Sequence, residues 1–129
     1  MKFFLASLAV AVAFIQTTVA QEPKEAPSKV VVAYYEALNK NSSTAIHNFW
    51  CSEDLARLAA GSSIYRTERI ASADAITKFH TLTKVEVVRE NKQAPRASVA
   101  VKLHYKNGSV RDMQAELVAE KGVWKIKNN

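Results

Sequence analysis

Few side chains of this sequence have the types and spacing that catalytic or metal-binding motifs require. His47, His80 and His104 are the only histidines, and they form neither an H-x-x-x-H nor an H-E-x-x-H pair. Such pairs place two imidazoles on one helix face, where both can bind the same metal ion. The chain also lacks the G-x-S-x-G, P-loop and G-x-G-x-x-G segments that mark common nucleophile and phosphate sites. We therefore expect no metal site and no cofactor, and we assign no catalytic residue.

Cys51 is the only cysteine, so the sequence predicts no internal disulfide. Glu53 and Asp54 follow it closely, whereas a reactive thiolate needs electropositive and accessible surroundings. We expect Cys51 to be a small buried side chain. An intermolecular disulfide stays open as an alternative if Cys51 is exposed.

Residues 1–20 have the features of a secretory signal peptide. A basic start at Lys2 precedes the apolar run Phe3–Ile15, which is shorter than the about 20 residues of a membrane-spanning helix. Thr18 and Ala20 are then the small residues of a cleavage site. We expect cleavage after Ala20 and a secreted or periplasmic product. No second long apolar run follows, so no transmembrane segment is expected after cleavage.

The net charge of the chain is +6, but its basic residues are scattered. No run of five or six like charges occurs, and such runs are typical of nucleic-acid-binding tails. The sequence therefore predicts no nucleic-acid partner. The charge supports at most a weak attraction to anionic surfaces.

The N-terminal part of the mature chain has the apolar spacing of helices. Residues 21–28, which include Pro23 and Pro27, are expected to be a flexible leader to a single domain at 29–129. Ser28 is expected to cap a first helix whose apolar stripe centres on Tyr34. Ser43 or Ser42 is expected to cap a second helix and Ser72 a later short one. A further helix start is expected at Ser52, with Gly61 as the left-handed C′ residue after that helix.

From Leu82 onward apolar and polar side chains alternate, which is the period of a half-buried strand. Asn107-Gly108 is expected to form a type I′ hairpin turn, which requires two positive φ angles. The order of helices followed by strands predicts an α+β fold with helices on one face of an antiparallel sheet. The residues expected on the buried face are Val85, Val87, Val99, Val101, Leu103, Tyr105, Met113, Ala115, Leu117, Ala119, Trp124 and Ile126.

Two long segments carry a resemblance to a known superfamily. They are "VVVAYYEALNKNSSTAIHNFW" and "ASVAVKLHYKNGSVRDMQAELVAEKGVWKI", the second of which ends in a hairpin with Glu120, Gly122 and Trp124. The chain resembles the nuclear-transport-factor-2-like (NTF2-like) superfamily, also called cystatin-like or ketosteroid-isomerase-like, and within it small exported bacterial members of unknown function. The resemblance implies a curved sheet around the first helix that leaves a conical pocket. The residues expected to line this pocket are Tyr34, Trp50, Val101, Leu103, Met113 and Leu117.

The resemblance also places Tyr34 where the isomerases of the superfamily carry a pocket tyrosine. Their carboxylates have no clear counterpart, because Glu53 and Asp54 are expected at a helix start and Asp112 on the polar face of its strand. A small enzyme of the isomerase or dehydratase type that uses Tyr34 therefore stays an alternative interpretation.

The polar face of the sheet suggests a binding role instead. Lys102, His104, Lys106 and Arg111 are expected to form a partner surface there, and the resemblance implies that this face also serves homodimers. The leading expectation is an exported, non-enzymatic domain of the cell envelope. It takes a small apolar ligand in the cone or a protein partner on the sheet face, and an accessory component of an envelope assembly is a further alternative.

Overall fold

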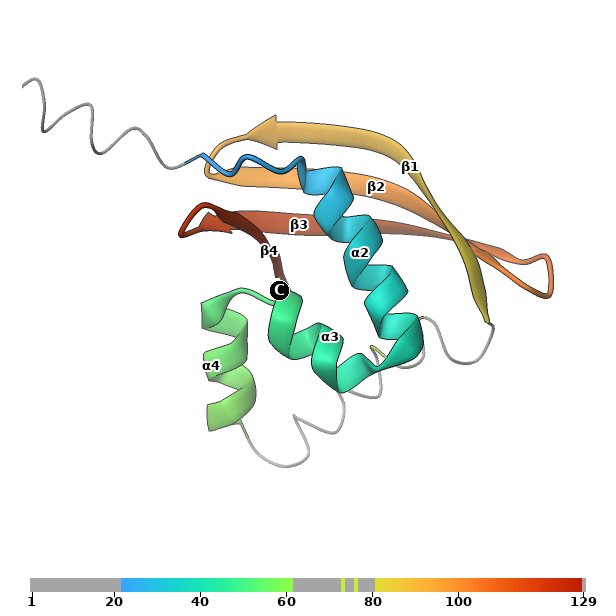
Figure 1. Cartoon of the computed structure of the whole chain (residues 1–129), viewed down its shortest axis with the longest axis horizontal. Coiled ribbons are helices and arrows are strands. Elements are labelled where there is room, and N and C mark those ends of the chain that lie inside the picture. Colours follow the sequence, from blue (N-terminus) through green and yellow to red (C-terminus); the bar gives the residue numbers. More distant parts are fainter. Residues whose placement is uncertain (1–21, 62–72, 74–75, 77–80, 129) are drawn as a thin grey trace, which may run out of the picture.

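The computed structural model describes residues 22–61, 73, 76 and 81–128. Within these ranges three helices precede one four-stranded antiparallel sheet (Figure 1). The predicted α+β class is confirmed. The helices are α2 (Pro27–Lys40), α3 (Ser42–Phe49) and α4 (Ser52–Ala60), and the strands are β1 (Leu82–Gln93), β2 (Arg96–Tyr105), β3 (Val110–Glu120) and β4 (Val123–Lys127).

Helix α2 begins earlier than the sequence predicted. Ala26 is its N-cap and Pro27 its first residue, so the prediction that Ser28 caps the helix was wrong. Proline suits this position because the first helical N–H has no partner within the helix and the ring holds φ near the helical value. The backbone N–H of Ser28 instead donates to Glu90 Oε1 of β1 at 2.9 Å, which ties the start of the helix to the sheet.

The junction between α2 and α3 is a single residue. Asn41 ends α2 and caps α3, and its side-chain Oδ1 accepts from the Thr44 N–H at 3.3 Å. The prediction of Ser42 or Ser43 as the cap was wrong, because the asparagine one residue earlier already fills this role.

Helix α4 starts at Ser52, as predicted, but it ends differently. Gly61 has φ −70° and ψ 163°, so the chain leaves the helix in an extended conformation. The expected left-handed ending was wrong. The predicted helix start at Ser72 lies outside the described residues.

The sheet has the order β1-β2-β3-β4, and α2 crosses one of its faces (Figure 1). We call this side the inner face; it carries Val99, Val101 and Leu103, which are almost fully buried. The register confirms the predicted alternation, since Val85 and Met113 lie opposite Leu103 and Val101. Lys102 and His104 lie on the opposite side, which we call the outer face.

The two hairpin turns differ from the prediction. In the β2–β3 turn only Gly108 has positive φ, at +87°, so the predicted type I′ turn at Asn107-Gly108 was wrong. Bonds from Gly108 N–H to Tyr105 O (2.9 Å) and from Tyr105 N–H to Ser109 O (3.0 Å) close a longer loop that needs one left-handed residue. The two-residue turn with positive φ at both positions is Lys121-Gly122, at 51° and 77°, between β3 and β4.

The core lies between the apolar stripe of α2, helix α3 and the inner face. Trp124 of β4 is 1% exposed and is one of its largest members, which agrees with its predicted role as the anchor of the last strand. No helix in the described part of the chain is both long and apolar enough to cross a membrane. The expected signal peptide lies outside the described residues.

Candidate functional site

Tyr34 points into the core from α2 and is held by Trp50. The indole Nε1–H of Trp50 donates to the Tyr34 hydroxyl at 3.0 Å, and both side chains are buried. The ring of Phe49 packs against Tyr34 with centroids 5.8 Å apart. Burial raises the pKa of Tyr34 above its usual value, so this phenol stays protonated at physiological pH.

The other residues expected to line a pocket lie in the same core. Val101, Leu103 and Leu117 are buried on the inner face, and Met113 is only partly buried. Within the described ranges, the hydrogen-bond and ring partners of Tyr34 are aromatic side chains and include no carboxylate. Asp112 lies opposite Lys102 on the outer face, as expected. The described part of the cone therefore has the composition of a packed core that includes Tyr34.

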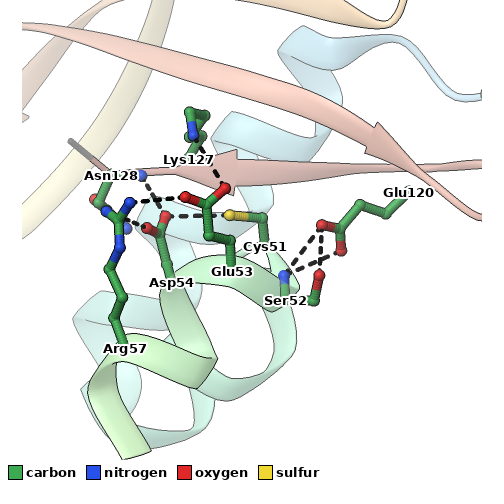
Figure 2. Close-up of polar contacts among 8 residues, drawn as sticks. All are labelled: Cys51, Ser52, Glu53, Asp54, Arg57, Glu120, Lys127 and Asn128. Atoms are coloured by element: carbon green, nitrogen blue, oxygen red, sulfur yellow. Dashed lines mark hydrogen bonds and ion pairs between the residues drawn. The ribbon is translucent and has the colours of Figure 1, made fainter. Parts of the chain in front are cut away.

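A second group of polar side chains gathers at the start of α4 (Figure 2). The thiol of Cys51 lies 3.2 Å from Asp54 Oδ2, and the same carboxylate accepts from the backbone N–H of Asn128. Asp54 is 4% exposed, and Arg57 approaches its other oxygen at 3.8 Å. Burial raises the pKa of the Cys51 thiol, which keeps it protonated and poorly nucleophilic. The expectation that Cys51 is a buried structural residue is confirmed.

The same group joins α4 to the β3–β4 hairpin. Glu120 accepts from the Ser52 backbone N–H at 3.1 Å and from the Ser52 hydroxyl at 2.9 Å (Figure 2). Its negative charge lies at the positive end of the helix dipole, where carboxylates are favourable. Glu53 also pairs with Arg57 at 2.7 Å and with Lys127 at 3.5 Å. No cluster of potential metal ligands was found among the described residues. The arrangement is a structural tie that fixes α4 on the sheet.

The outer face carries two ion pairs between neighbouring strands. Lys102 Nζ lies 2.9 Å from Asp112 Oδ1, and His104 Nε2 lies 2.8 Å from Glu86 Oε1. The hydrogen bond from His104 lowers the pKa of Glu86, and the bond to Asp112 raises the pKa of Lys102. These side chains lie on the surface and are at least partly exposed, so each pair contributes little to stability.

The expected partner surface is only partly on the outer face. Lys102 and His104 lie there, whereas Lys106 follows β2 in the turn. Arg111 lies opposite Leu103 and is therefore on the inner face, so its placement beside Lys102 was wrong. The sequence already held the reason, because Arg111 is two residues before Met113 and shares its side of the strand.

A surface hollow of about 340 Å³ lies beside the Lys102–Asp112 pair. In the register, Arg89, Ala100 and Gln114 form one row across β1, β2 and β3. The small side chain of Ala100 leaves space between its two long neighbours. We call this feature the outer hollow, and its lining includes Val88, Arg89, Ala100, Lys102, Asp112 and Gln114. Sequence reasoning missed it, because the face of Arg89 depends on the register of β1.

Comparison with solved structures defines the class of this fold. A crystal structure of a Campylobacter jejuni protein described as an NTF2-like transpeptidase superposes with a TM-score of 0.62 at 12% identity, over 81% of this chain and 100% of that chain. A SEC-C motif containing protein from Rhodopseudomonas palustris gives a TM-score of 0.56 at 12% identity, over 80% of this chain and 76% of that chain. The fold is NTF2-like, as the sequence resemblance implied.

The family of the chain follows from its sequence. Residues 20–127 match the family described as a domain of unknown function, DUF4878, and the chain belongs to this family. No curated protein is significantly similar in sequence.

Proposed function

We propose that this protein is an exported, non-catalytic interaction domain that docks a partner protein of the cell envelope on the outer face of its sheet. The observation that carries the proposal is the outer hollow, a concave and partly apolar feature of about 340 Å³ in the middle of a polar sheet face. Pockets for small molecules are typically of about 300–1,000 Å³, so a hollow at the low end of this range has room for one inserted side chain of a partner.

The lining of the hollow suggests what the partner presents. The guanidinium of Arg89 has no ion-pair partner within the described ranges, whereas the ammonium of Lys102 forms an ion pair with Asp112. Ala100 and Val88 supply apolar surface between these polar groups. An acidic side chain on an apolar stem fits this lining, because its carboxylate can pair with Arg89 while its stem contacts Ala100.

The core supports the non-catalytic part of the proposal. The Tyr34 hydroxyl accepts from Trp50, and its described partners supply no general base. General acid–base catalysis needs such a group within hydrogen-bond reach of the reacting atoms. The buried, protonated Cys51 also offers no ready nucleophile. The export part rests on the basic and apolar pattern of residues 1–20.

Photo-crosslinking in the native host tests the docking proposal. We would place a photoreactive residue at Gln114 and compare two arginine substitutions, Ala100→Arg in the hollow and Ser109→Arg in the β2–β3 turn. The Ser109→Arg protein should cross-link the same partner as the parent protein, and Ala100→Arg should lose most of that product. Equal cross-linking of both folded variants would contradict docking at the hollow.

A second candidate function is the binding of a small oxygen-bearing apolar ligand inside the cone. It is favoured by Trp124, whose indole Nε1 is buried and has no hydrogen-bond partner in the described part of the chain. A buried donor without an acceptor is unfavourable, so an acceptor on a bound molecule would stabilise the site. Native mass spectrometry of the gently purified protein should then show an added mass that Trp124→Phe reduces.

A further inference from the structure

The two edges of the sheet differ in whether another segment of the chain pairs with them. At β4 the chain covers the edge, because Trp50 forms a parallel bridge with Ile126 and the Cys51 N–H donates to Ile126 O at 2.8 Å. At β1 no strand of the described chain lies beyond the edge. An open edge presents unpaired N–H and C=O groups that can pair with another strand.

The open edge is long and carries apolar side chains at its centre. Strand β1 has 12 residues, and its second half from Val87 to Gln93 is exposed. Val87 and Val88 are 41% and 49% exposed and lie next to each other in the middle of the strand. Exposed apolar side chains on an edge strand favour association, whereas the surrounding charges decide which partner and register are allowed.

A bulge at Val88 decides which side chains of β1 share a face. Glu86 lies opposite Lys102 on the outer face, and after the register shift Arg89 lies opposite Ala100, also on the outer face. Without the bulge, two residues three apart would point to opposite sides of the sheet. The bulge thus places an acid and a base on one face, on either side of the two valines.

We propose that β1 is the pairing edge of a two-fold symmetric dimer in which Glu86 of each copy lies opposite Arg89 of the other. The two β1 strands run antiparallel, and Val87 of one copy lies opposite Val88 of the other. The two sheets thereby join into one continuous sheet. On either side of the bulge, directly opposite side chains then share a face, because both copies carry the same bulge; these pairs are Lys84–Asn91, Val85–Glu90 and Glu86–Arg89. This register also brings the ends of the strand, Leu82 and Gln93, opposite each other, so the strands overlap along their full length.

The charges of β1 select this register over its neighbours. A shift by two residues in one direction places Lys84 opposite Arg89, so that two cations meet at both symmetric positions. A shift in the other direction places Glu86 opposite the uncharged Asn91 and leaves the ends unpaired. Opposite charges stabilise a directly paired position and like charges destabilise it. This proposal uses the same Arg89 guanidinium as the partner on the outer face, and it sets the two outer hollows side by side.

Two charge reversals test the register through mixing. Arg89→Glu alone places Glu opposite Glu86, and Glu86→Arg alone places Arg opposite Arg89, so each variant should dimerise roughly 10- to 100-fold more weakly than the parent protein. When the two variants are mixed, both symmetric positions hold an acid opposite a base. A heterodimer with about the parent affinity should form, as measured by analytical ultracentrifugation and by native mass spectrometry.

Lys121→Glu is the control, because it makes a similar charge change in the β3–β4 turn, away from the β1 edge of the sheet. It should dimerise like the parent protein and should not restore full affinity to Glu86→Arg. A parent protein that stays monomeric at millimolar concentration would overturn the proposal. So would single variants that dimerise normally, or a mixture that forms no heterodimer although circular dichroism shows both variants folded. A dimer disrupted by Ala100→Arg but not by these reversals would place the interface on the outer face instead.

Discussion

Replacement of each buried tryptophan by phenylalanine should distinguish an indole N–H that donates a hydrogen bond from one that has no acceptor. Trp50 and Trp124 are both buried, and the same substitution removes the same atoms from each. Trp50 Nε1 donates to Tyr34 at 3.0 Å, whereas Trp124 Nε1 has no partner in the described part of the chain. Trp50→Phe loses a hydrogen bond with a net value of about 0.5–1.5 kcal/mol, and Trp124→Phe removes an unsatisfied donor whose burial costs about 1–3 kcal/mol.

Urea unfolding measures the two effects as changes in the free energy of unfolding. Trp50→Phe should be more destabilising than Trp124→Phe by about 1.5–4.5 kcal/mol, the sum of the two effects, if both sites relax to a similar extent around the smaller ring. A double-mutant cycle with Tyr34→Phe isolates the hydrogen bond, and it should give a coupling of about 0.5–1.5 kcal/mol for Trp50 and close to zero for Trp124. Equal costs for the two substitutions, together with no coupling between Trp50 and Tyr34, would refute the assignment of these indole groups.

Other consequences of the structure can be checked separately. Glu120→Ala removes the carboxylate that accepts from Ser52 at the start of α4 and should lower the free energy of unfolding by about 1 kcal/mol; Glu116→Ala, on the outer face, is the control and should change it little. The Cys51 thiol should react with a maleimide at neutral pH far more slowly in the folded protein than in urea, because burial raises its pKa, and rapid labelling of the folded protein would contradict this. His104→Ala should raise the pKa of Glu86 toward its ordinary value, which carboxyl NMR titration would show. Because the pKa of Glu86 is lowered in the folded protein, the stability from this pair is present above the ordinary pKa of Glu. It is lost as the pH falls through the lowered pKa of Glu86. N-terminal sequencing of the exported protein should begin at Gln21, and a start at Met1 would show that the leader is retained.

Local sequence patterns were sufficient for the class of the fold and for the faces of most strands. The alternation from Val99 to Tyr105 gave the buried side of β2 correctly, because a strand turns each successive side chain to the opposite face whatever its partner is. The apolar stripe around Tyr34 gave the buried side of α2 for the corresponding reason. These periods are properties of the backbone itself, so they can be read before the packing is known.

Details of capping and turns were less predictable, because several nearby residues compete for one role. Asn41, Ser42 and Ser43 are all good helix caps, and the geometry of the α2–α3 junction selected Asn41. Asn107-Gly108 has the residues of a type I′ turn, but the hydrogen bonds between Tyr105 and Ser109 favour a longer loop. Lys121-Gly122 adopts the tighter turn although its sequence signal is weaker.

Contacts between distant segments were decided by the tertiary structure alone. Ser52 and Glu120 are 68 positions apart, and only the packing of α4 against the β3–β4 hairpin brings the carboxylate to the helix start. The outer hollow and the shared face of Glu86 and Arg89 both depend on the register of β1 and on its bulge at Val88. The sequence by itself determined which side chains alternate along each strand, since that alternation is local. Which of them meet across strands was decided by long-range backbone hydrogen bonds, whose register depends on how the whole core packs.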